Sequence, residues 1–509
     1  MLRSSFCGLV VLMSLMASLG VWAEVRLPAI FSNYMVLQRN ARVKIWGWAK
    51  AGEKITINAS WQKQATAVAG DQGQWMAELE TPAGGGPYQV EIKGETNSVV
   101  LDDVLIGEVW LCSGQSNMAF TVRGAKNAAE EIQKAYYPQI RHFAVARHPA
   151  RSPQEDCKGT WTVCSPKTVS GYTAVGYFFA RELYEKLKIP VGLIHSSWGG
   201  TPIRSWTPLE AQQDDPVIKE IKKKMDEAGA KYDEQKAKTR YEQLLKQWKE
   251  KVKIAREKKQ KLPRRPRPPM NPLLSQRYPG NLFNGMIAPL VPYTIRGALW
   301  YQGEANAHSL SDAWHYRVQL ERLIKSWRNV WSKKAQRQED FYFYAVQLPN
   351  FRALQTHPVE EEDTWPVLRE SIQVATTKVP RAGMVVTIDV GEAKNIHPKD
   401  KQTVGYRLAC RALAEVYGRQ GEYFGPLFRQ AKIEGDKVIL DFDHTGRGLV
   451  FRGDATKAFA IAGNDRKFVW AEAKIDGQRI IVHSPQVKEP AAVRYAWANN
   501  PAGAVLYNQ

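Results

Sequence analysis

Four short polar segments each follow an apolar stretch of the sequence, and together they hold the groups that acyl transfer requires. A serine hydroxyl attacks a carbonyl carbon once a base removes its proton, and the oxyanion that forms needs hydrogen-bond donors. The first and last segments supply a serine and a histidine, and the two between them supply glycines and side-chain amides. The segments are Gly114-Gln115-Ser116-Asn117, Ser197-Trp198-Gly199-Gly200-Thr201, Trp300-Tyr301-Gln302-Gly303-Glu304-Ala305-Asn306 and Asn395-Ile396-His397-Pro398.

Residue chemistry assigns roles within these segments. Ser116 is the predicted nucleophile and His397 the predicted general base. Gly114 permits a tight turn, so Ser116 is expected to head a helix with its own N–H directed at the site. Gly199 and Gly200 can bring a second backbone N–H close to the reacting atoms.

Polar side chains of the same segments complete the predicted site. Gln302 is a neutral donor for the oxyanion, and the residues predicted to contact substrate are Gln115, Asn117, Trp198, Glu304 and Asn306. For Glu304 the alternative is a purely structural role within its loop. Asn117 is also placed to fix the loop behind the serine.

Other nucleophiles and histidines lie in the same stretches. Ser113 lacks the glycine turn that precedes Ser116, and Cys112 lies inside the predicted strand, where a packed thiol is the usual outcome. His195 ends a strand, a position typical of a hydrogen-bonded core histidine. Ser116 and His397 are therefore the preferred pair.

The elements that carry these segments alternate between strands and helices. Alternation of this kind is typical of a parallel sheet covered by helices on both faces. Such sheets place their sites at the carboxyl ends of the strands, where the four segments lie. Apolar runs predict strands over Val104–Ser113, Val191–Ile194, Ile295–Tyr301, Phe341–Gln347 and Met384–Ile388, and amphipathic patterns predict helices over Ala174–Leu187 and Trp314–Trp331.

Two β-rich regions and an insertion accompany this α/β core of residues 104–420. Short alternating strands and glycine turns over residues 24–103 predict a small β-sandwich, and residues 421–509 read as a C-terminal β-rich region. The insertion spans about 208–272 and is predicted to form two antiparallel helices that break near Gly229. Its proline-rich end, Pro263–Pro269, predicts an extended return. A helical stripe supports this prediction: Tyr241, Leu244, Leu245, Trp248, Val252 and Ala255.

Half of the formal net charge of +20 lies in the insertion, where residues 215–267 hold 19 Lys and Arg against 9 Asp and Glu. One interpretation is a solvated helical face, and the other is contact with an anionic glycan. Nucleic acid is the least natural partner because the N-terminus predicts export.

Residues 1–23 have the pattern of a signal peptide. Arg3 precedes the apolar run Leu9–Leu19, and Val21 and Ala23 are the small residues of a cleavage site. The mature chain is therefore expected to begin at Glu24 and to be secreted or periplasmic. No other stretch is long and apolar enough to span a membrane.

Four cysteines follow the predicted signal peptide: Cys112, Cys157, Cys164 and Cys410. An even number in an exported chain permits two disulfides, with buried thiols as the alternative. Their spacing does not match a zinc site, and no metal or organic cofactor is implied.

The motifs GEVWLCSGQSNM, SSWGGTPIRSW, ALWYQGEANA and NIHPKDKQTVGYRLA resemble the successive blocks of the sialate O-acetylesterase family, a branch of the SGNH hydrolases. The resemblance extends from LPAIFSNYMVLQ to VRYAWANNPAGAVLYN, nearly the whole mature chain. It implies an SGNH-type three-layer α/β/α core with Ser116 as nucleophile and His397 as base. It also implies that the Ser116 N–H, a glycine of Gly199-Gly200 and Gln302 donate to the oxyanion.

One position departs from the SGNH pattern. These enzymes usually carry an aspartate three residues before the histidine, which holds the imidazole in the productive tautomer. Here that position is Lys394. Asp389 or Glu392 is then the candidate that orients His397, and a backbone carbonyl is the alternative, which would give a Ser–His dyad.

The resemblance implies a secreted carbohydrate esterase that removes O-acetyl groups from sialic acid through an acyl-enzyme. An acetylesterase for another glycan, such as xylan or an acidic polysaccharide, is one alternative. A non-catalytic glycan-binding surface protein is the other, and Lys394 is the sequence feature that favours it. Activity on a generic acetyl ester separates enzyme from binder.

Overall fold

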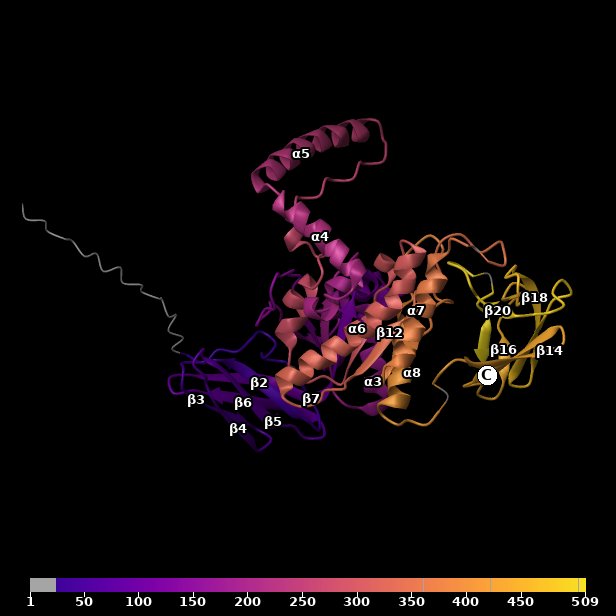
Figure 1. Cartoon of the computed structure of the whole chain (residues 1–509). Coiled ribbons are helices and arrows are strands. Elements are labelled where there is room, and N and C mark those ends of the chain that lie inside the picture. Colours follow the sequence, from indigo (N-terminus) through magenta and orange to yellow (C-terminus); the bar gives the residue numbers. More distant parts are fainter. Residues whose placement is uncertain (1–23, 360, 422, 502) are drawn as a thin grey trace, which may run out of the picture.

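The computed structural model describes residues 24–509 apart from 360, 422 and 502, so the predicted signal peptide lies outside the described residues. The chain forms an N-terminal β region, a central α/β region and a C-terminal β region, which follow one another across the molecule (Figure 1). A helical projection, built from the insertion, rises from the central region.

The central sheet has the strand order β13-β12-β11-β7-β10-β8-β9. Each neighbouring pair is parallel except β8 and β9, which are antiparallel. The prediction of a purely parallel sheet is therefore wrong at this edge. No α-helix lies in the chain between β8 and β9, and a parallel return normally needs a crossover helix. The strands are β7 (Ser98–Gly114), β8 (Tyr137–Ala144), β9 (Trp161–Cys164), β10 (Val191–Ser197), β11 (Gly297–Tyr301), β12 (Tyr342–Val346) and β13 (Ala382–Val385).

Helices cover both faces of this sheet. Helices α3 (Ala174–Leu187) and α8 (Lys401–Glu415) pack with Trp110 and Cys112 of β7, whereas α6 (Leu310–Ala335) and α7 (Thr364–Lys378) pack in the cluster that holds Val109 and Leu111. Successive side chains of a strand point to opposite faces, so β7 is buried from both sides. The short helices α1 (Ser116–Ala119) and α2 (Ala128–Gln133) follow β7.

The N-terminal region shares strand β7 with the core. Residues of β7 up to Gly107 pair with β1 and β6, and residues from Glu108 onward pair with β10 and β11. The boundary expected at 103/104 therefore falls inside one continuous strand. A second, two-stranded sheet joins β2 and β5. The strands are β1 (Val36–Gln38), β2 (Arg42–Trp48), β3 (Lys54–Ala59), β4 (Lys63–Val68), β5 (Gln74–Glu80) and β6 (Gly85–Lys93).

The C-terminal region has its own apolar core around Phe459, Ile480 and Val482. Its six-stranded sheet has the order β14-β15-β19-β18-β17-β20, and β16 pairs with β21. Strands β18 and β19 form a hairpin that turns at Asp476-Gly477. The strands are β14 (Leu427–Glu434), β15 (Lys437–Asp443), β16 (Leu449–Phe451), β17 (Phe459–Ala462), β18 (Val469–Asp476), β19 (Arg479–His483), β20 (Ala492–Tyr495) and β21 (Leu506–Asn508).

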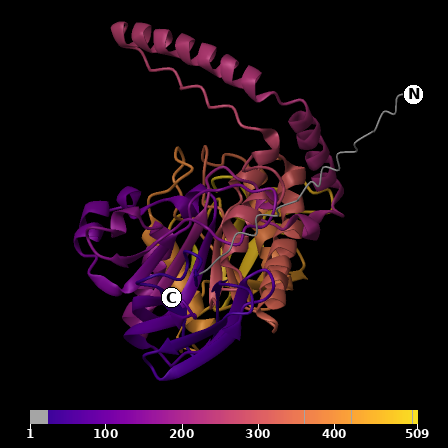
Figure 2. The ribbon, with the colours of Figure 1, turned by 90° about the vertical axis from the view of Figure 1, so that its left-hand side faces the viewer.

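The insertion forms a projecting arm, residues 216–271, made of α4 (Pro216–Ala230), α5 (Glu234–Glu257) and an extended return. The break predicted near Gly229 is present, but the antiparallel helix pair is not. In both views α4 and α5 are joined end to end and do not lie side by side, and the return runs back beside α5 (Figures 1 and 2). Trp248 Nε1 donates to Pro263 O at 2.9 Å. The return therefore contacts the apolar stripe at Trp248, whereas Leu244 of the same stripe stays exposed.

The four described cysteines are free thiols, so the thiol alternative fits this structure and the disulfides do not form in it. Cys112, Cys164 and Cys410 are buried, each in a different element. Across residues 24–509, with the three gaps stated above, no helix has both the length and the apolar character needed to cross a membrane.

Candidate active site

Ser116 and His397 meet at the carboxyl edge of the central sheet. Ser116 Oγ lies 2.8 Å from His397 Nε2, although 281 positions separate the two residues, and both side chains are partly buried. Strand β7 ends at Gly114 and α1 begins at Ser116. A side chain cannot replace the glycine, because Gly114 has a φ of +130° and an added Cβ would lie 2.3 Å from Tyr301 O.

His397 is held through its backbone. Asn395 Oδ1 accepts from the His397 N–H at 3.1 Å, and Asn395 Nδ2 donates to His397 O at 2.8 Å. Asn117 Nδ2 donates to Ile396 O at 3.0 Å. These contacts fix the loop before α8 and so place the imidazole against Ser116.

Neither predicted carboxylate orients the ring. Asp389 accepts two hydrogen bonds from Arg407, at 2.7 and 2.6 Å, and one from Tyr507. Glu392 accepts from Asn395 Nδ2 and from the Lys399 N–H. Among the described residues, no side chain or carbonyl forms a hydrogen bond with His397 Nδ1. Ser116 and His397 thus form a pair without a third, ring-orienting residue in this structure, and Glu392 is one step removed through Asn395.

Backbone N–H groups of two segments lie close to the Ser116 side chain. The Ser116 N–H is in the first turn of α1, where a helix offers its own residues no acceptor. Gly199 packs directly on Ser116, because a Cβ added to it would lie 3.1 Å from Ser116 Cβ. Gly200 is exposed and turns away with a φ of +71°. Gly199 is therefore the glycine that can donate beside Ser116.

Gln302 is already engaged with the protein. Its Nε2 lies within hydrogen-bonding distance of three oxygens, on Gln115, Thr201 and Asn306, at 3.2, 3.1 and 2.8 Å. Its Oε1 accepts from Tyr316 at 2.7 Å, and its side chain is fully buried. An amide has only two N–H donors, so donation to an oxyanion would require one of these contacts to break.

Most of the residues predicted to contact substrate are part of the buried framework. Gln115, Asn117, Glu304 and Asn306 are each less than 8% exposed and hydrogen-bond to one another or to Gln302. Little of their surface is left to touch a sugar. Trp198 differs, because its ring is partly exposed, with the Arg147 guanidinium 5.8 Å from its centroid.

Lys401 was not predicted from the sequence. It is fully buried at the start of α8, and its Nζ donates to Asn117 Oδ1 at 2.6 Å. The same asparagine donates from Nδ2 to Glu304 Oε1 at 2.5 Å and to Ile396 O. The only sequence signal is the position of this lysine four residues after His397. Lysine is rarely buried, so that signal is weak.

Burial and charge together adjust the ionisation of the site. Burial, and then the positive charge of Lys401, lower the pKa of His397 below its usual 6.5. Burial also lowers the pKa of Lys401 to about 7 and raises the pKa of Glu304. An imidazole with a lowered pKa is neutral at neutral pH, which is the form that accepts a proton.

The remaining sequence candidates lie outside this arrangement. His195 Nε2 lies 2.6 Å from Ser197 Oγ. Ser113 is fully buried, and its Oγ has no partner among the described residues. In the described part of the chain, no group of three or more His, Cys, Asp or Glu is placed to hold a metal ion.

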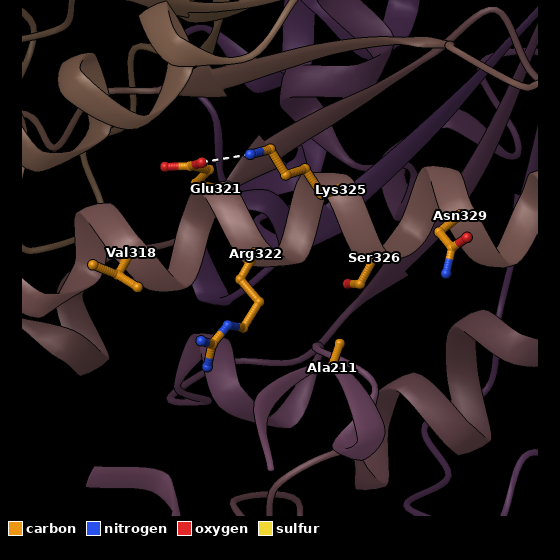
Figure 3. Close-up of a pocket in the computed structure, with 7 residues that line it drawn as sticks. All are labelled: Ala211, Val318, Glu321, Arg322, Lys325, Ser326 and Asn329. Carbon is orange, nitrogen blue, oxygen red and sulfur yellow. Dashed lines mark hydrogen bonds and ion pairs between the residues drawn. The ribbon is translucent and has the colours of Figure 1, made fainter. Parts of the chain in front are cut away.

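A surface hollow of about 510 Å³ between α6 and residue Ala211 lies apart from the Ser–His pair (Figure 3). Its charged lining residues are already paired, since Lys325 contacts Glu321 at 2.6 Å and Arg322 binds Asp215 at 3.2 Å. None of its lining residues belongs to the four segments, so it plays no part in the proposed chemistry.

Comparison with known proteins identifies the family of the chain. Residues 106–256 and 278–414, more than half of the chain, match the family model for carbohydrate esterases described as sialic acid-specific acetylesterase. The chain belongs to this acetylesterase family. The resemblance of the four motifs is thereby confirmed, and the protein is a carboxylic ester hydrolase.

Relatives of this acetylesterase family match along nearly all of the chain. Sialate O-acetylesterase of Rattus norvegicus is 32% identical over 95% of this chain and 91% of its own length. The human sialate O-acetylesterase is 29% identical over 97% of this chain and 91% of its own length. A crystal structure of a carbohydrate acetylesterase from Xanthomonas citri is 33% identical, with a TM-score of 0.78 over 96% of this chain and 97% of that one.

Proposed function

We propose that the protein removes O-acetyl groups from an acetylated sugar, with O-acetylated sialic acid as the expected substrate. The observation that carries the proposal is the 2.8 Å contact between Ser116 Oγ and His397 Nε2. The names of the relatives support the substrate class, because those from rat and human are sialate O-acetylesterases. The Xanthomonas citri structure is described more broadly, as a carbohydrate acetylesterase.

The proposed reaction has two acyl-transfer steps. His397 Nε2 takes the Ser116 proton while Oγ attacks the acetyl carbonyl, and the oxyanion accepts hydrogen bonds from the N–H groups of Ser116 and Gly199. The imidazolium then gives its proton to the departing sugar oxygen. Water, activated by the same imidazole, attacks the acetyl-serine and releases acetate.

In this mechanism Lys401 is a positioning residue. Asn117 touches both Lys401 and the carbonyl of Ile396, the residue before His397. The lysine therefore fixes the orientation of the amide that holds the histidine loop. Its charge also favours neutral imidazole, because a nearby positive charge disfavours a second one.

Acetate release from a panel of sugars tests the proposal. The panel holds O-acetylated sialic acid, acetylated xylan and an acetylated acidic polysaccharide, with p-nitrophenyl acetate as the generic ester. We expect hydrolysis of the generic ester and the highest kcat/KM on the sialic acid. No hydrolysis of any ester would instead support the glycan-binding alternative, and preference for xylan would overturn the substrate assignment.

We further propose that the protein is exported and that residues 1–23 are removed. The supporting pattern is the charged, apolar and small-residue order of that segment. N-terminal sequencing of protein from the extracytoplasmic fraction is expected to begin at Glu24. An intact N-terminus in the cytoplasmic fraction would contradict the proposal.

We propose that the arm contacts anionic glycan, because residues 215–267 carry 19 basic against 9 acidic side chains. Charge–charge attraction at an exposed surface is screened by salt. Neutralising the arm should therefore lower the salt concentration that elutes the protein from an anionic polysaccharide.

The test variant changes four exposed cations of α5 to Gln, and the control variant changes four exposed lysines of the C-terminal region to Gln. The former are Lys246, Lys249, Lys253 and Arg256, and the latter are Lys457, Lys467, Lys474 and Lys488. Equal shifts in both variants would show that only net charge matters.

A further inference from the structure

Arg204 carries a positive charge that the described protein does not neutralise. It lies in the short helical turn Ile203–Ser205, directly after the Gly199-Gly200 loop. Its Nε is buried without a hydrogen-bond partner, and its guanidinium forms no ion pair with any described carboxylate. An unpartnered buried cation is unfavourable unless a ligand supplies the missing acceptor.

A second arginine lies beside it. Gly280 N–H donates to Arg204 O at 3.0 Å, which places the segment of Arg277 against that of Arg204. Burial, and then the charge of Arg277, lower the pKa of Arg204 to about 10, whereas Asp312 opposes this effect without forming an ion pair. Two adjacent guanidinium groups with open donors are suited to bind a carboxylate, which accepts from arginine in a bidentate way.

This arginine pair adjoins the reacting serine through the glycine loop. A Cβ added to Gly199 would lie 3.1 Å from Ser116 Cβ, and a Cβ added to Gly200 would lie 3.8 Å from Arg277 Nη2. Gly199 and Gly200 are neighbours in the chain, and consecutive Cα atoms are only about 3.8 Å apart, so the surroundings of Ser116 and of Arg277 meet at this loop. The glycine loop therefore places Arg277 within reach of a sugar whose acetyl group lies at Ser116.

We propose that Arg204 and Arg277 form a carboxylate-binding subsite that selects an acidic sugar, either a sialic acid or a uronic acid, as the acetylated substrate. The inference rests on the proposed esterase function and adds to it the residues that recognise the substrate charge. Arg204 supplies the buried donor at the back of the subsite, and Arg277, which is exposed, closes it from the solvent side.

Matched substrates test the subsite. Each substrate pair consists of an O-acetylated sugar acid and the same acetylated sugar with its carboxylate replaced by a primary amide. One pair is built on a sialic acid and the other on a uronic acid. We expect wild-type protein to prefer the acid of one pair, which identifies the sugar. Arg277→Gln and Arg204→Gln should lower the acid-to-amide ratio of kcat/KM by about 10- to 100-fold, mainly through KM, because a charge-assisted hydrogen bond is lost.

Arg447→Gln is the matched control, because Arg447 is exposed in the C-terminal region, outside both the glycine loop and the arm. It removes the same charge and should leave the ratio unchanged. If Arg204→Gln does not fold, Arg277→Gln decides the question. An unchanged ratio in Arg277→Gln, or no acid preference in wild-type protein, overturns the subsite. Failure to hydrolyse p-nitrophenyl acetate would instead overturn the esterase function.

Discussion

Replacing Ser116 by Ala should leave a folded protein that hydrolyses p-nitrophenyl acetate roughly 10⁴- to 10⁶-fold more slowly than the wild type. The substitution removes Oγ, which lies 2.8 Å from His397 Nε2. The backbone N–H of residue 116 remains, so part of the oxyanion stabilisation persists. Steady-state kinetics measure the loss, and thermal unfolding shows that the fold is intact.

Ser113→Ala is the matched control for this variant. Ser113 lies three residues earlier in β7, and its buried Oγ has no partner among the described residues. Its removal should change kcat/KM very little. His397→Ala should resemble Ser116→Ala, and the double variant should lose little more, because residues that act as a unit are not additive. Full activity in Ser116→Ala would remove it as the nucleophile.

Replacing Lys401 by Met should lower kcat/KM by about 100-fold, since misplacement of a catalytic group by about 1 Å has an effect of this size. Methionine keeps an unbranched apolar stem but cannot donate to Asn117 Oδ1. The Asn117 amide, which holds Ile396 O, then loses the contact that fixes its orientation. Kinetics with a generic acetyl ester measure the loss.

The pH profile separates positioning by Lys401 from a purely structural role. Wild-type kcat/KM should fall only below pH 6.5, as acid protonates an imidazole whose pKa is lowered. Lys401 has a pKa of about 7, so it is charged where His397 titrates. Removing that charge should raise the pKa of His397 and move the acid limb to higher pH.

Stability measurements provide the second control for Lys401→Met. The pKa of Lys401 falls from 10.5 to about 7 on folding, so the folded protein binds fewer protons between these values. Wild-type stability should therefore rise with pH across this window, and the variant should lack the rise.

Lys399→Met, at an exposed lysine two residues earlier, is the matched substitution for Lys401→Met. Identical kinetics and acid limbs in both variants would contradict the role of Lys401.

Local sequence patterns predicted much of the fold. Helix α3 spans Ala174–Leu187 as its apolar periodicity indicates, and strands β10, β11 and β12 lie where the apolar runs place them. Strand β13 begins two residues before the predicted run Met384–Ile388 and ends three residues before its end. The errors concern how elements pair. The antiparallel edge strand β9, the continuity of β7 across residue 103 and the separation of α4 from α5 all depend on contacts between distant segments.

The sequence by itself determined the family, the order of the four segments, and Ser116 and His397 as the candidate pair. These follow from residue type and from turns set by neighbouring residues, such as the turn at Gly114. Only the tertiary structure decided that Asn395 and Asn117 hold the histidine loop in place of an aspartate, that Gln302 is tied to the framework and that Lys401 is buried. Burial and hydrogen-bond partners depend on residues hundreds of positions apart, and such packing has no local signal.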